Sequence, residues 1–205
     1  MKRVIRSIAI ILALVFVFVL AACGKKKEPD KVVDKSAAEI NEAIKNAWGE
    51  DGYGANTEIE RDWLINSFGL DLDKVDDYYA AQNAISSINP DTVIILKVKD
   101  GYAKEAVDAL NKVYANAVNY GTLYPFAVAK IMNARLYNEG NYVIYVIGGS
   151  AYTGDSEEEE VKFTIAEYEK VDKALEEIFG KKLENLAIVP EVETNKGGVL
   201  ISVNP

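Results

Sequence analysis

The sequence feature that most constrains the fold is the run at 142–147, Tyr-Val-Ile-Tyr-Val-Ile, in which every side chain is apolar or aromatic. β-Branched and aromatic residues favour a strand, and successive side chains of a strand point to opposite faces of a sheet. A strand without polar positions therefore needs cover on both faces, which predicts an interior place in a sheet. Residues 138–141 before it, Asn-Glu-Gly-Asn, predict the turn of a hairpin.

Other strands are predicted from the same kind of pattern. The strongest lies at 91–99, Asp-Thr-Val-Ile-Ile-Leu-Lys-Val-Lys, and is bounded by Asn-Pro and Asp-Gly turn dipeptides. A weaker strand pattern lies at 77–85. Two apolar segments at 186–194 and 198–203 flank Asn-Lys-Gly-Gly and predict a second hairpin.

Helices are predicted from apolar periodicity and from their end signals. Between Ala103 and Gly121, apolar residues recur at spacings of three and four. Three Ser/Thr-x-x-Glu spacings predict capping boxes at Ser36–Glu39, Thr57–Glu60 and Thr164–Glu167. The third box precedes an apolar stripe that ends before Gly180, a residue typical of helix C-termini. Each predicted box adjoins an apolar stripe of a helix. In chain order the stripes consist of Ile40, Ala43, Ile44, Ala47 and Trp48; of Ile59, Trp63 and Phe68; and of Tyr168, Val171, Leu175, Ile178 and Phe179. Gly69 is predicted to end the second helix.

Together these patterns predict an α+β fold. We expect a mostly antiparallel sheet of about four to six strands, packed against amphipathic helices. A short helical turn opened by Tyr124-Pro125 and reaching Met132 completes the predicted elements.

The first residues of the chain carry a targeting pattern. Three basic residues are followed by an apolar run at 8–22, as in secretory signals, and the run is shorter than the ~20 residues of a transmembrane helix. Leu20-Ala21-Ala22-Cys23 resembles the lipobox of bacterial lipoproteins. The resemblance implies cleavage between Ala22 and Cys23 and attachment of a diacylglyceryl group to the Cys23 sulfur. The alternatives are an incidental thiol after an uncleaved anchor and a spare thiol in a secreted protein.

The residues after Cys23 predict a tether. A diacylglyceryl group supplies two acyl chains, which anchor a protein stably. Lysines at 25–27 would lie at the headgroups of an anionic membrane, and the polar stretch up to residue 35 contains Pro29 and no periodicity. The predicted partner at this end of the chain is therefore the membrane, reached through the lipid.

Composition and missing residue types exclude several functions. With 23 basic and 32 acidic residues and a formal charge of −9, the chain lacks the basic surface that nucleic acid requires. It has no histidine and a single cysteine, which excludes serine–histidine–acid and cysteine–histidine catalysis and the usual zinc sites. Neither a GxGxxG turn nor a P-loop is present. We therefore expect no catalytic residue, no metal ligand and no cofactor other than the lipid.

The chemistry that remains open depends on carboxylates, on a serine–lysine pair or on calcium. Asp71, Asp73, Asp76 and Asp77 are clustered, but their spacing lacks the side-chain ligand and the glycine of an EF-hand loop. A solvated acidic connector is favoured over a looser calcium site.

Twelve tyrosines raise the alternative of carbohydrate stacking. Core packing is favoured for Tyr114, Tyr137, Tyr142 and Tyr145, which lie in predicted strands or on a helix stripe. Exposed positions suited to sugar binding are expected for Tyr53, Tyr78 and Tyr79.

The predicted domain organisation has five parts. They are a signal peptide at 1–22, a lipidated tether at 23–35, an α+β domain at 36–149, an acidic linker at 150–160, and a helix with a β-hairpin at 161–205. The linker assignment rests on small residues and on four consecutive glutamates, because like charges repel one another. The last part is either an appendage or completes the sheet of the domain.

Residues 36–149 also resemble a known family. The features that carry the resemblance are the strand region at 89–100, the helix after it, Tyr124-Pro125, and Gly-Asn-Tyr-Val at 140–143 before an apolar strand. With them, this part of the chain is similar to a domain of unknown function common in Gram-positive lipoproteins, the family numbered 4358. The lipobox and the short tether fit the same family. The resemblance implies a fold and a place on the outer side of the cell membrane, and it carries no established activity.

From these observations we expect a membrane-anchored, extracytoplasmic lipoprotein that acts as a non-catalytic binding or interaction module. An envelope protein or cell-wall glycan is the expected partner besides the membrane. One alternative is a carboxylate-based hydrolase of cell-wall glycan, which requires two carboxylates about 5–10 Å apart. The other is a small solute receptor, for which the chain is short.

Overall fold

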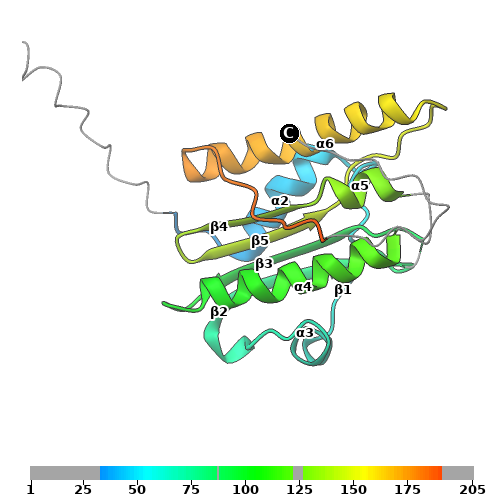
Figure 1. Ribbon diagram of the computed structural model, residues 1–205. Coiled ribbons are helices and arrows are strands. Elements are labelled where there is room, and N and C mark those ends of the chain that lie inside the picture. Colours follow the sequence, from blue (N-terminus) through cyan, green and yellow to red (C-terminus); the bar gives the residue numbers. More distant parts are fainter. Residues whose placement is uncertain (1–32, 87, 122–126, 191–205) are drawn as a thin grey trace, which may run out of the picture. The chain divides into compact units, whose positions relative to one another are not determined.

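The computed structural model describes residues 33–86, 88–121 and 127–190. The predicted signal peptide, Ala22, Cys23 and most of the tether lie outside these ranges, as do Tyr124-Pro125 and most of the C-terminal hairpin. In the described part, five strands form one antiparallel sheet in the order β1-β2-β3-β5-β4, accompanied by five α-helices (Figure 1). The α+β class and the predominantly antiparallel sheet are as predicted.

The wholly apolar run lies inside the sheet, as its composition predicted. The strands are β1 (Thr57–Glu58), β2 (Val75–Gln82), β3 (Thr92–Val98), β4 (Arg135–Glu139) and β5 (Tyr142–Ile147). β3 occupies the middle, and β5 lies between β3 and β4. In the β3–β5 pair, Thr92 is opposite Ile147 and Lys97 is opposite Tyr142. Every residue of β5 is buried.

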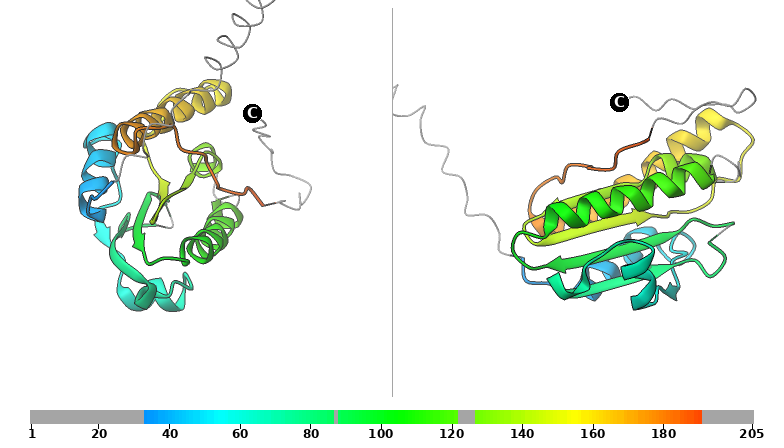
Figure 2. Two further views of the ribbon diagram at one scale, coloured as in Figure 1. Left: turned by 90° about the vertical axis from the view of Figure 1, so that its left-hand side faces the viewer. Right: turned by 60° about the horizontal axis from the view of Figure 1, so that its bottom comes forward.

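Helices cover both faces of the sheet, which explains the lack of polar positions in β5. The helices are α2 (Ala37–Trp48), α3 (Arg61–Asn66), α4 (Ala103–Gly121), α5 (Val128–Met132) and α6 (Glu157–Phe179). Alternate residues of β3 and β5 enter two separate hydrophobic clusters: one packs against α3, α4 and α5, the other against α2 and α6. Figure 2 shows the two helical layers with the sheet between them.

Several predicted helix ends are confirmed. Ser36 Oγ accepts a hydrogen bond from the Glu39 amide at 3.2 Å, and the Glu39 carboxylate accepts one from the Ser36 amide at 2.8 Å. This reciprocal capping box starts α2. α4 has the predicted bounds. α6 ends at Gly180, which has a φ of 75°, a left-handed conformation that glycine adopts without steric cost.

The other two predicted capping boxes are wrong. Thr57 is in β1, where it pairs with Gln82, and the Glu60 side chain makes no capping hydrogen bond at the start of α3. α6 begins after Ser156, whose Oγ accepts a hydrogen bond from the Glu159 amide at 3.4 Å. Thr164 and Glu167 are consequently buried residues in the middle of that helix.

The predicted acidic linker is shorter than expected. Its four glutamates, Glu157 to Glu160, form the first turn of α6, where the helix dipole favours negative charge. Lys162 pairs with Glu158 one turn later at 2.6 Å. Because α6 packs beside α2 on one face of the sheet, the helix predicted as part of an appendage belongs to the same unit as the sheet. Residues 181–190 form no strand.

The turn between β4 and β5 is tighter than the predicted 138–141. Glu139 pairs with Tyr142, which leaves Gly140 and Asn141 as a two-residue connection. Gly140 has a φ of 56°, and glycine at the first central position is the preference of a type II′ hairpin turn.

Candidate functional site

The first described residues of the chain are held at one end of the sheet. Residues 33–36 are fixed at the end that carries the β4–β5 turn: Tyr142 Oη donates to the Lys35 carbonyl at 2.7 Å, and Lys97 Nζ lies 2.8 Å from Asp34 Oδ1. We call this the entry end. The opposite end, where Gln82, Thr92 and Ile147 lie, is called the far end (Figure 1).

A buried ion pair lies at the far end. Asp91 immediately precedes β3, and its Oδ1 is 2.8 Å from the Nζ of Lys130 on α5. Burial raises the pKa of Asp91, and the hydrogen bonds and charge supplied by Lys130, Asn89 and Gly54 oppose this shift without cancelling it. The structure thus keeps a carboxylate at a place where an unpaired charge would be costly.

The main chain at Gly54 approaches this carboxylate closely. A Cβ at position 54 would lie 2.3 Å from Asp91 Oδ2, so only glycine fits without displacing the aspartate. Asn83 connects both segments, because its Nδ2 donates to the Gly54 carbonyl at 3.0 Å and its amide donates to the Asp91 carbonyl at 2.8 Å. Three separate segments are locked together around Asp91.

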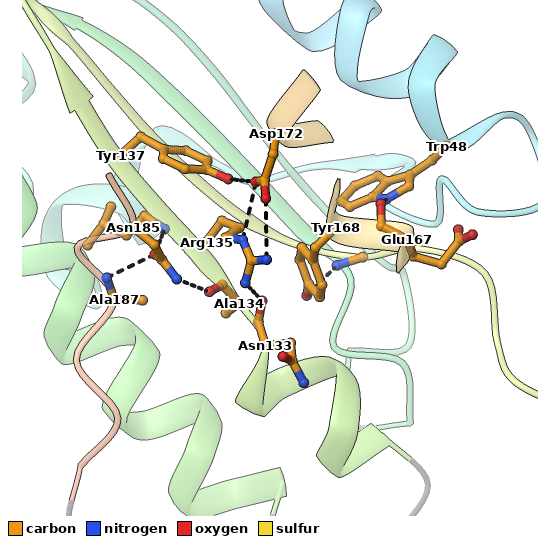
Figure 3. Close-up of polar contacts among 12 residues, drawn as sticks. Trp48, Asn133, Ala134, Arg135, Tyr137, Glu167, Tyr168, Asp172, Asn185 and Ala187 are labelled. Atoms are coloured by element: carbon orange, nitrogen blue, oxygen red, sulfur yellow. Dashed lines mark hydrogen bonds and ion pairs between the residues drawn. The ribbon is translucent and has the colours of Figure 1, made fainter. Parts of the chain in front are cut away.

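A second buried carboxylate, Glu167, lies on α6. Its Oε2 accepts a hydrogen bond from the Ser150 amide at 3.0 Å, and its Oε1 pairs with Lys170. Burial alone would raise the pKa of Glu167, but the hydrogen bonds from Lys170 and Ser150 outweigh it and lower the pKa. The Glu167 carbonyl accepts a hydrogen bond from Trp48 Nε1 at 3.0 Å (Figure 3), and Gly148 packs directly against the Trp48 ring.

Arg135, on the edge strand β4, organises a third polar group. Its guanidinium contacts both carboxylate oxygens of Asp172, at 3.2 and 3.4 Å, and Tyr137 donates to the same carboxylate (Figure 3). It also lies 4.9 Å above the ring of Tyr168, a cation–π distance. Burial raises the pKa of Tyr137, and the negative charge of Asp172 raises it further.

Tyr168 links these groups into one network. Its hydroxyl donates to the Lys130 carbonyl at 2.8 Å and accepts a hydrogen bond from the Gly148 amide at 3.2 Å. Within the described residues, Tyr145 Oη is the one buried side-chain polar atom that lacks a partner. Because almost every buried polar side chain here has a hydrogen-bond partner, we expect the far end to be rigid.

The network does not resemble a hydrolytic site. Each buried carboxylate, Asp91 and Glu167, is paired with its own lysine, and no open pair of acids suited to glycoside hydrolysis emerges from these contacts. In the part of the chain that the structure describes, no group of three or more acidic, cysteine or histidine side chains could hold a metal ion. Both buried carboxylates at this end are thus engaged in ion pairs.

The loop between β2 and β3 exposes two large apolar side chains at the far end. Ile85 is 58% exposed and Ile88 is 69% exposed. The loop is held by turn hydrogen bonds: the Ile85 amide donates to Asn83 Oδ1 at 3.0 Å, and the Asn89 amide donates to the Ile85 carbonyl at 3.0 Å. Both isoleucines are thus presented by a structured turn that begins and ends on the rigid network. We call residues 83–86 and 88–90 the presenting loop.

The structure tests the predictions made for the tyrosines. Tyr114, Tyr137, Tyr142 and Tyr145 are buried, as expected. The expected exposure of Tyr53, Tyr78 and Tyr79 is wrong, because all three are half-buried. The hydroxyl of Tyr53 donates to Asn41 Oδ1 at 2.6 Å and lies 3.2 Å from that of Tyr79. These positions do not form an open aromatic platform.

The acidic cluster at 71–77 has structural roles. Asp71 accepts a hydrogen bond from the Asp73 amide at 3.2 Å and starts a short 3₁₀ helix, Leu72–Lys74. Asp77 accepts one from the Ala37 amide at 2.7 Å. Asp76 and Asp77 lie in β2, so the predicted solvated connector covers only the first half of the cluster.

Two features of the far end, the presenting loop and the Asp91–Lys130 pair, were not predicted from the sequence. Two isoleucines between Asn83 and Asn89 are the signal that could have revealed the loop, because apolar residues inside a turn segment have no core position to fill. The pair has no such signal, since its two residues are distant in sequence and meet only in the folded chain.

Comparison with known families identifies the central part of the chain. Residues 49–148 match the family described as a domain of unknown function (DUF4358). The chain carries a DUF4358 domain. The match includes the whole sheet, the presenting loop and Lys130, whereas α2 and α6 lie outside it. The predicted resemblance is therefore confirmed for the domain itself.

No curated protein and no solved structure matches the chain. Among the described residues, none of the helices has the length and apolar character needed to span a membrane.

Proposed function

We propose that this protein is a membrane-anchored extracytoplasmic lipoprotein, held by a diacylglyceryl group on Cys23, and that its DUF4358 domain is a non-catalytic binding module. The sequence Leu20-Ala21-Ala22-Cys23 supports the anchor, and the absence of histidine supports a role without covalent catalysis. The observation that carries the binding role is the presenting loop, which holds Ile85 and Ile88 in solvent on a rigid support.

The position of the first described residues limits how far this module can lie from the proposed anchor. Val33 follows Cys23 by ten positions, and an extended chain spans about 3.4 Å per residue. The entry end, where residues 33–36 are fixed, would then lie within roughly 35 Å of the membrane. The tether thus limits the distance between the entry end and the membrane.

The chemistry of the presenting loop favours a protein partner in the envelope. Exposed apolar side chains on a loop held by a rigid scaffold are typical of recognition surfaces. Because hydrogen bonds of Asn83 and Asn89 hold the two ends of the loop, less conformational entropy would be lost when a partner binds. The acidic charge of the chain makes nucleic acid an unsuitable partner.

The anchor can be tested by metabolic labelling with an alkyne-tagged fatty acid in a Gram-positive host. The wild-type chain should carry the label and remain with the membrane. Cys23→Ala should abolish labelling and leave an unprocessed precursor, because the modified sulfur is absent. An unlabelled wild-type chain, or a variant with an unchanged mature N-terminus, would refute the lipid assignment.

The binding role can be tested by photo-cross-linking in cells. A photoreactive residue at Ile88 should give adducts with a specific envelope protein, and Ile85→Ser in the same chain should reduce their yield. Lys182 provides the control, because it is exposed beside Lys181, which pairs with Glu139 near the β4–β5 turn at the entry end. Equal adduct patterns from both positions would argue against the presenting loop as the contact surface.

A further inference from the structure

After α6 the chain returns along the open edge of β4, where residues 185–188 form what we call the strap. The Leu186 amide donates to the Leu136 carbonyl at 2.6 Å, and the Leu136 amide donates to Asn185 Oδ1 at 2.9 Å. Figure 3 shows Asn185 beside the strand. Leu136 is one of the residues of β4 whose main-chain groups face away from β5, so the strap occupies part of an edge that could otherwise accept another strand.

Two asparagine side chains bind the strap backbone from opposite sides. Asn185 Oδ1 also accepts a hydrogen bond from the Ala187 amide at 3.1 Å, while its Nδ2 donates to the Ala134 carbonyl at 3.0 Å. On α4, Asn111 Nδ2 donates to the Leu186 carbonyl at 3.1 Å, and its Oδ1 accepts from the Ile188 amide at 2.9 Å. Asn111 thus pairs with an extended backbone as a neighbouring strand would.

The contacts of the strap are mostly with its backbone. Leu186 and Ala187 pack partly against the hydrophobic cluster beneath α4, whereas Ile188 is 68% exposed. A single hydrogen bond makes only a modest net contribution to stability, so no one contact is enough to hold the strap in place. The groove between α4 and β4 therefore demands an extended backbone and a few small or apolar side chains.

The geometry points to the groove between α4 and β4 as a binding site for an extended peptide with the pattern Asn-apolar-small-apolar, and to the strap as its intramolecular occupant. A peptide of another protein would take the place of the strap beside β4, in a contact related to β-augmentation. Asn111 and the main chain of Leu136 would form hydrogen bonds with the backbone of that peptide, as they do with the strap. The position that corresponds to Asn185 would provide the only polar side-chain requirement. This site is separate from the presenting loop and does not depend on the lipid anchor.

The test uses the full chain in mild detergent and a fluorescent peptide with the sequence of residues 183–190. In the wild-type chain the strap competes with the peptide. Asn185→Ala weakens the strap and leaves the groove intact, so it should strengthen peptide binding about tenfold, the effect of roughly 1.4 kcal/mol. Ile188→Pro, which removes a strap donor to Asn111, should act in the same direction and serves as a second variant if the first does not fold.

Two controls distinguish specific binding of the peptide at this site from nonspecific adsorption. Asn111→Ala, combined with Asn185→Ala, should abolish the gain, because it removes a groove contact that the added peptide needs. A peptide in which the asparagine is replaced by alanine should not compete. Retained Trp48 fluorescence checks the fold of each variant, since this indole is buried.

Two outcomes would overturn the proposal. Folded Asn185→Ala and Ile188→Pro variants that bind the peptide no better than the wild-type chain would show that the strap is a permanent part of the fold and overturn the proposal. Strap exchange between two copies, seen as a dimer by light scattering in place of peptide binding, would overturn it in favour of self-association.

Discussion

Removing the charge of Lys130 gives a stability prediction whose size and pH dependence both follow from the far-end ion pair. Lys130→Met retains an unbranched aliphatic chain and leaves Asp91 without its counter-ion. Breaking a buried pair in this way typically costs about 3–5 kcal/mol. The Lys130 side chain is 15% exposed against 4% for Asp91, and Asn89 and Gly54 still donate to the carboxylate. We therefore expect the lower end of that range, about 3 kcal/mol near neutral pH.

The cost should fall as the pH is lowered. Burial already raises the pKa of Asp91 above its ordinary value, and Lys130 is the main group that opposes this shift. Without the lysine the pKa of Asp91 rises further. A carboxyl group whose pKa is higher in the folded than in the unfolded chain contributes stability below its unfolded pKa, and this contribution is lost as the pH rises through the folded pKa. Protonation of Asp91 would thus relieve the defect in acid.

Urea unfolding followed by tryptophan fluorescence measures both effects, because Trp48 is buried. The difference in unfolding free energy between the wild-type chain and Lys130→Met should be clearly larger at about pH 7.5 than at about pH 5. Asp91→Asn combined with Lys130→Met provides the control: with no charge left, the pH dependence of the difference should vanish and part of the stability should return. A cost below about 1 kcal/mol near neutral pH, or a cost that is the same at both pH values, would refute the reasoning.

Three further predictions concern other parts of the fold. Gly148→Ala would place a Cβ 2.6 Å from the Trp48 ring; this overpacking should lower the unfolding free energy by about 1–3 kcal/mol and change the folded-state fluorescence, and an unchanged spectrum would contradict it. Burial raises the pKa of Tyr114 to about 12, so it should resist ionisation in an alkaline absorbance titration and the stability it contributes should be lost as the pH rises through that value; ionisation of every tyrosine near pH ~10 in the folded chain would argue otherwise. Ser36→Ala should cost roughly 1 kcal/mol in urea unfolding, because it removes the accepting half of a capping box, and Ser156→Ala should cost less, because its capping bond is longer, at 3.4 Å; the reverse order would show that bond length does not rank these caps.

Local patterns predicted the central elements of the fold well. The strand at β3, the helix at α4 and the capping box of Ser36–Glu39 depend on neighbouring residues alone, so the sequence contains the information needed for them. The interior position of β5 followed from its lack of polar residues. In each of these cases local preference and tertiary packing favour the same structure.

The errors arose where another interaction, tertiary or within a helix, overrides a local pattern. Thr57 has the spacing of a helix cap but pairs with β2, and nothing near it in sequence reveals that partner. Repulsion among Glu157 to Glu160 was weighed against a helix, yet the dipole, the Ser156 cap and Lys162 compensate it. The far-end network could not be predicted from the sequence either, because Asp91, Lys130 and Tyr168 come from three separate segments of the chain.

The strand order has a consequence for how the sheet assembles. β2 with β3 and β4 with β5 are neighbours along the chain, whereas the seam between β3 and β5 joins segments separated by α4 and α5. Local pairs form early, and closing the longer loop adds an entropic cost that slows the last step. Until β5, which ends at Ile147, has formed, the edge of β3 that pairs with it has no neighbouring strand. A chain cut off before β5 would therefore expose the most apolar seam of the sheet to pairing with another copy.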